Sequence, residues 1–93
     1  MDPEEPFALP IDGVLDLHAF APADVVSVVQ EYLEACAERR ILRVRIVHGR
    51  GKGVQRAEVR RLLAAHPRVA SCADAAPEEG GWGATIVHLR GAP

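Results

Sequence analysis

Apolar and polar positions along the chain follow two different periods, and these predict four strands and two helices. A period of two, typical of a half-buried strand, is clearest between residues 42 and 47. There one side would carry Leu42, Val44 and Ile46, and the other Arg43, Arg45 and Val47. Shorter apolar runs predict further strands over residues 14–18, 69–75 and 84–90.

Helical spacing occurs in two stretches between these strands. Val26, Val29, Leu33 and Cys36 recur at helical spacing after Pro22, which suits a first helical position, and this helix should end near residues 39–40. A second helix is predicted over residues 54–65, before Pro67. The order of elements is therefore β-α-β-α-β-β. It predicts an α/β fold: a two-layer sandwich with a four-stranded mixed sheet, both helices on one face and the last strand antiparallel to the others.

This topology brings particular side chains to one edge of the sheet. The first two strands would end at His18 and His48, and parallel strands meet at their carboxyl ends. Asp16 lies two residues before His18, and the glycine-rich connection 80–83 leaves the third strand at the same edge. If Leu15 and Leu17 face the helices, Asp16 and His18 face the open side. Arg43, Arg45, His88 and Arg90 would face that side too, which makes it cationic.

The turn after the second strand reads His48-Gly49-Arg50-Gly51-Lys52-Gly53 and leads into the second helix. Glycines let the backbone approach an anion closely, and a helix N-terminus offers unpaired N–H groups, so this turn predicts a phosphate-binding loop. It lacks the hydroxyl that follows the lysine in a nucleotide-binding P-loop, and its spacing is not that of a dinucleotide fingerprint. A two-metal nuclease would need a cluster of carboxylates, and the sequence shows none at this edge.

Charge supports an anionic partner. Net charge is −2, yet nine of the eleven Lys and Arg residues fall between residues 39 and 61, where Glu58 is the one acid. A local basic region on an acidic protein is typical of a single anionic partner such as nucleic acid.

Chain length, the N-terminal residues and the cysteines narrow the class of protein further. Ninety-three residues suit one domain, which we expect over residues 13–91 after an acidic, proline-rich arm over residues 1–12. The arm does not resemble a basic signal peptide, and no run of about 20 apolar residues is present, so we expect a cytoplasmic protein without a membrane span. Cys36 and Cys72 are too far apart in sequence for a CxxC pair and predict reduced thiols.

Several of these segments together resemble the Smr (small MutS-related) domain family. They are Leu15-Asp16-Leu17-His18, the loop 48–53, Leu62-Leu63 with His66-Pro67, and Gly80-Gly81-Trp82-Gly83-Ala84-Thr85-Ile86-Val87. The resemblance implies a fold similar to the C-terminal domain of translation initiation factor three. Since no mismatch-recognition or ATPase module fits in this length, we expect a stand-alone Smr protein of the bacterial type. The family often has glycine after LDLH, where this chain has Ala19-Phe20, and Phe20 could offer a base a stacking surface.

The resemblance also implies an activity. Family members are endonucleases that nick or cleave branched DNA or RNA, including messenger RNA on stalled ribosomes, so DNA repair or ribosome quality control is the expected setting. The motif match assigns catalysis to Asp16, His18 and His48. We expect phosphate or nucleic-acid contacts from Gly49, Arg50, Gly51, Lys52, Gly53, Arg43 and Arg45.

The expected chemistry needs no metal and no cofactor. One histidine would deprotonate water or an RNA 2′-hydroxyl, and the other would protonate the leaving oxygen. The alternative is a non-catalytic adaptor that binds nucleic acid or the ribosome with the same fold. The choice between DNA and RNA stays open, since a phosphate cradle does not report the 2′-hydroxyl.

Overall fold

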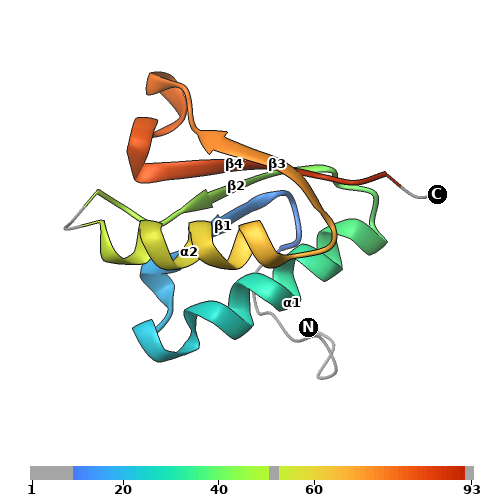
Figure 1. The fold of residues 1–93 in the computed structure, drawn as a ribbon, viewed down its shortest axis with the longest axis horizontal. Coiled ribbons are helices and arrows are strands. Elements are labelled where there is room, and N and C mark those ends of the chain that lie inside the picture. Colours follow the sequence, from blue (N-terminus) through green and yellow to red (C-terminus); the bar gives the residue numbers. More distant parts are fainter. Residues whose placement is uncertain (1–9, 51–52, 92–93) are drawn as a thin grey trace.

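A computed structural model describes residues 10–50 and 53–91, and these residues form one sheet with two helices packed on a single face (Figure 1). The strands are β1 (Val14–Asp16), β2 (Arg43–Val47), β3 (Val69–Asp74) and β4 (Ala84–Leu89). The helices are α1 (Val25–Glu38) and α2 (Val54–Ala65). Both lie on the same side of the sheet, so the expected two-layer α/β arrangement is confirmed.

The strand order is β1-β2-β4-β3. Strands β1 and β2 are parallel, whereas β4 lies between β2 and β3 and is antiparallel to both. The mixed sheet and the reversed last strand are therefore as predicted. Because β1, β2 and β3 run the same way, their carboxyl ends and the start of β4 lie at one end of the sheet, at the left of Figure 1. The connections that follow these strand ends form the candidate site.

The core lies between the sheet and the helices. Helix α1 contributes a fully buried stripe at helical spacing, and the sheet contributes the side chains that alternate inward. The core residues with no exposed surface include Leu15, Leu17, Val29, Tyr32, Leu33, Cys36, Val44, Ile46 and Val87. Tyr32 also ties α1 to the start of β1, because its hydroxyl accepts the Gly13 N–H at 3.1 Å and donates to the Val14 carbonyl at 3.0 Å.

The outer face of the sheet is only partly cationic. Arg43, Arg45 and His88 do lie on it, as the alternation predicts, since Arg43 pairs with His88 and Arg45 with Ile86. It also carries a small apolar cluster of Ala75, Ala84 and Ile86, against which Val47 packs.

The first strand is shorter than predicted. It ends at Asp16, and residues 17–19 form a turn of 3₁₀ helix, so His18 lies in a turn and not on a strand. The cause is local, because the Asp16 carboxylate accepts the backbone N–H of His18 at 2.9 Å and caps the turn. Phe20 is half-buried and packs against the core.

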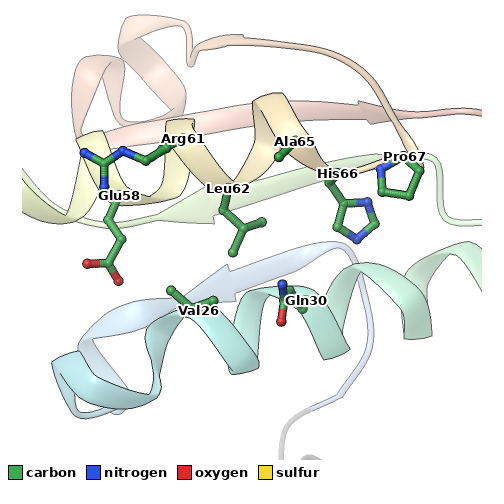
Figure 2. A pocket seen from close by; sticks show the side chains of 8 residues that line it. All are labelled: Val26, Gln30, Glu58, Arg61, Leu62, Ala65, His66 and Pro67. Carbon is green, nitrogen blue, oxygen red and sulfur yellow. The ribbon is translucent and has the colours of Figure 1, made fainter.

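A groove of about 310 Å³ runs between the two helices (Figure 2). Val26 of α1 and Leu62 of α2 point toward each other across it, and His66 points into its far end. Its lining contains neither His18 nor any residue of the glycine-rich loop.

Candidate functional site

Asp16 and His18 form an exposed carboxylate–imidazole pair at the carboxyl end of β1. His18 Nδ1 lies 2.7 Å from Asp16 Oδ1, and the same oxygen accepts the His18 backbone N–H. These contacts lower the pKa of Asp16, chiefly through the backbone hydrogen bond. An ionised Asp16 fixes the Nδ1–H tautomer of His18 and leaves its Nε2 as an acceptor.

His18 Nε2 lies against the glycine-rich loop, as the meeting of the two parallel strand ends predicted. Gly49 has φ +82°, and a Cβ built on it would lie 3.0 Å from His18 Nε2. A side chain at this position would therefore press on the imidazole as well as strain the backbone. With its side chain 65% exposed, His18 is open to an incoming ligand on its other sides.

His48 has a different environment from His18. It is 5% exposed, with Nδ1 2.9 Å from the Gly49 carbonyl and Nε2 2.9 Å from Thr85 Oγ1. A carbonyl can only accept, so Nδ1 carries the proton and Nε2 accepts from the Thr85 hydroxyl. Burial lowers the pKa of His48, which favours this neutral form. Both ring nitrogens thus have protein partners, and the ring links the first residues of the loop to Thr85 of β4.

The loop is attached to the 80–83 connection. The Gly83 carbonyl accepts the backbone N–H groups of His48 at 3.1 Å and Gly49 at 2.9 Å, so these two amides are engaged within the protein. The Arg50 guanidinium donates to the Gly80 carbonyl at 3.3 Å. Arg50 lies over Gly83, where a Cβ would come within 3.0 Å of its Cγ.

Helix α2 begins directly beyond the loop. Gly53, its N-cap residue, has φ +78° and no side chain that could cap the first-turn amides. A pocket of about 160 Å³ lies here, lined by His48, Gly49, Arg50, Gly53, Val54, Gln55 and Arg56. The predicted phosphate contacts of Gly51 and Lys52 lie outside the described residues.

Arg43 and Arg45 contact the same connection from the open face of the sheet. Arg43 forms an ion pair with the Glu79 carboxylate at 2.8 Å, and Arg45 donates to the Glu79 carbonyl at 3.1 Å. The pKa of Glu79 lies below its ordinary value because of the Arg43 hydrogen bond. Glu79 therefore offsets part of the positive charge that the sequence predicted on this face.

A polar network behind His48 was not predicted from the sequence. Thr85 is fully buried, and its Oγ1 accepts from Arg60 Nε at 3.2 Å while it contacts His48. Arg60 and Arg56 each lie 2.6 Å from Asp74 Oδ1 at the end of β3. The one available sequence signal was a hydroxyl at an inward position of a strand, on the same face as the apolar Val87 and Leu89.

Metal-ligand clusters and membrane-spanning helices were sought in the described part of the chain. Within residues 10–50 and 53–91, no three His, Cys, Asp or Glu side chains gather closely enough to hold a metal ion. No helix in the same residues is long and apolar enough to cross a membrane.

Comparison with protein families identifies the domain type. A model of the Smr domain matches residues 15–90. Endonuclease MutS2 of Thermus thermophilus is 38% identical over 76 residues, which cover 82% of this chain and 10% of that protein. Endonuclease MutS2 of Shouchella clausii is 36% identical over 80 residues, covering 86% of this chain and 10% of that protein. The chain thus spans about a tenth of the length of these relatives.

Solved structures agree with the fold. The crystal structure of the Smr domain of Thermus thermophilus MutS2 superposes with a TM-score of 0.80 at 37% identity, covering 85% of this chain and 99% of that one. YdaL of Escherichia coli, a stand-alone small MutS-related protein, gives a TM-score of 0.78 at 26% identity, covering 84% of this chain and 64% of that one.

Proposed function

This chain belongs to the Smr domain family, and we propose that it is a metal-independent endonuclease in which His18 transfers the proton. The observation that carries the proposal is the convergence of the Asp16–His18 pair with Gly49 of the loop. A carboxylate that fixes an imidazole, whose second nitrogen faces a glycine-rich turn, is an arrangement suited to acid–base chemistry on a phosphodiester. The relatives named Endonuclease MutS2 support the same class of reaction.

In this proposal His18 Nε2 accepts the proton of the nucleophile, which is water or an RNA 2′-hydroxyl. The nucleophile oxygen forms a bond to phosphorus, and the bond from phosphorus to the leaving oxygen breaks. Asp16 stabilises the imidazolium that results, because its carboxylate already holds Nδ1–H. The leaving oxygen takes its proton from solvent, which reaches this exposed edge of the sheet.

The scissile phosphate would lie in the pocket at the start of α2. Three features favour an anion there: the uncapped helix N-terminus, the exposed Arg50, and Arg56, whose buried Nε has no hydrogen-bond partner among the described residues. Lys52 and Gly51 stay predicted contacts from the sequence. Since most of this attraction is to phosphate, binding should fall steeply with added salt.

His48 has a separate part in this proposal. It positions the loop, because its ring joins the Gly49 carbonyl to Thr85. The predicted role of His48 in proton transfer would require the ring to break one of these two contacts.

Incubation of the purified protein with labelled branched DNA and structured RNA, with and without a chelator, tests the activity. We expect cleavage that survives chelation, and Asp16→Asn should lower its rate by a factor on the order of 10²–10⁴. Glu31→Gln, which removes one exposed carboxylate from α1, is the matched control and should cleave normally. Binding without cleavage of either substrate would contradict the proposal and favour the adaptor. Loss of cleavage on chelation would refute its metal independence.

A further inference from the structure

Trp82 lies beside the proposed phosphate site. It directly precedes Gly83, whose carbonyl accepts the backbone N–H of Gly49, and Gly49 in turn borders His18 Nε2. The Trp82 side chain is 45% exposed. A large aromatic residue is thus exposed on the connection whose backbone holds the loop beside His18.

The turn that carries Trp82 is held from several directions. Arg50 donates to the Gly80 carbonyl and Arg45 to the Glu79 carbonyl. The Gly81 N–H donates to the Ala76 carbonyl at 3.0 Å, and the Gly83 N–H to the Gly80 carbonyl at 3.0 Å. A backbone that is held in this way before a ligand binds lowers the entropy cost of binding through Trp82.

The other described aromatic side chains have roles in the core. Tyr32 is fully buried, and Phe20 packs against the core. Trp82 is the large aromatic residue that the described part of the chain exposes, and its two neighbours in sequence, Gly81 and Gly83, lie against cationic Arg50. An exposed aromatic ring close to a cationic, phosphate-binding site is the combination that binds single-stranded nucleic acid.

We propose that Trp82 stacks on an unpaired base next to the bound phosphate, so that the substrate is single-stranded or locally unpaired at the cleavage position. This inference rests on the proposed function, since it needs a phosphate in the neighbouring pocket. Inside a duplex each base face is covered by its neighbours, and a stacking side chain gains access only where a base leaves the stack. Stacking does not distinguish DNA from RNA, and both therefore belong in the test.

The chain contains one tryptophan, so tryptophan fluorescence, excited where tyrosine does not absorb, reports on Trp82 alone. The experiment titrates the full chain with single-stranded DNA, single-stranded RNA and a duplex of the same length. Binding is followed both by Trp fluorescence and by the anisotropy of a label on the oligonucleotide. We expect quenching by both single strands, weak quenching by the duplex, and tighter binding of the single strands.

Two variants complete the test. Trp82→Ala should weaken single-strand binding by about 5- to 150-fold and leave duplex binding nearly unchanged. Trp82→Phe, which keeps an aromatic face, should retain most of the affinity, and circular dichroism would confirm that both variants fold. Binding without quenching, equal affinity of Trp82→Ala and wild type, or a preference for duplex would overturn this inference but leave the endonuclease proposal standing. Absence of any nucleic-acid binding would overturn both.

Discussion

Replacing Thr85 by valine should destabilise the protein although it hardly changes the shape of the side chain. The substitution removes the hydroxyl that donates to His48 Nε2 and accepts from Arg60 Nε. His48 is buried and would lose the partner of one ring nitrogen, whereas Arg60 keeps its ion pair with Asp74. An unsatisfied buried polar group costs about 1–3 kcal/mol, so we take about 2 kcal/mol as the expected loss of unfolding free energy.

Urea unfolding and thermal melting would measure this loss. For a domain of this size, about 2 kcal/mol corresponds to a fall in Tm of roughly 8–16 °C. Thr85→Ser is the matched control, because it keeps the hydroxyl and loses a methyl group worth about 1 kcal/mol. The imidazole ¹⁵N shifts should show Nδ1–H for His48 in the wild type and in Thr85→Ser. Wild-type stability of Thr85→Val, or an Nε2–H tautomer in the wild type, would refute the assigned network.

Two further predictions concern the loop and its histidine. Gly49→Ala should lower the unfolding free energy by about 1–2 kcal/mol, because Gly49 has a positive φ. It should also lower the cleavage rate of the folded protein by about 10- to 100-fold, because the added Cβ would displace His18. Gly13→Ala, at the start of β1 and away from the loop, places alanine at a similar positive φ of +94°, so equal loss of cleavage in both variants would argue against the contact with His18. Because burial lowers the pKa of His48, the unfolded chain takes up the proton first as pH falls from about 6.5, and unfolding free energy should decrease until the folded residue also protonates. Urea titrations between pH 7.5 and 5 would measure this slope, and an unchanged slope in His48→Gln would contradict it.

The sequence was sufficient to predict the helices and strands and the end of the sheet that carries the candidate site. Helix α2 begins at Val54 and ends at Ala65 as its periodicity indicated, and Leu15, Val44 and Val87 are buried as the alternation required. The meeting of His18 with Gly49 followed from the parallel pairing of the first two strands. A single sequence is enough to predict these features, because its periodicity gives the helices and strands. A general rule then brings the carboxyl ends of parallel strands together.

The features that sequence could not predict depend on contacts between distant residues. The buried ring of His48 is satisfied by a hydroxyl 37 residues away, and the positive charge of Arg43 is offset by a carboxylate 36 residues away. Hydrophobic periodicity gives the buried face of a strand but not its neighbours, so the insertion of β4 between β2 and β3 was not foreseen. The turn at His18 escaped prediction because a side chain, and not strand pairing, satisfies its backbone N–H.

The most direct test of the central claim is the cleavage rate of His18→Ala measured beside its affinity for the same substrate. Since the loop, Arg50 and the start of α2 are untouched, the affinity should stay within a few-fold of wild type. The cleavage rate should fall by a factor on the order of 10²–10⁴, the range for loss of an acid–base group. A wild-type cleavage rate in His18→Ala would contradict the assignment of proton transfer to this residue.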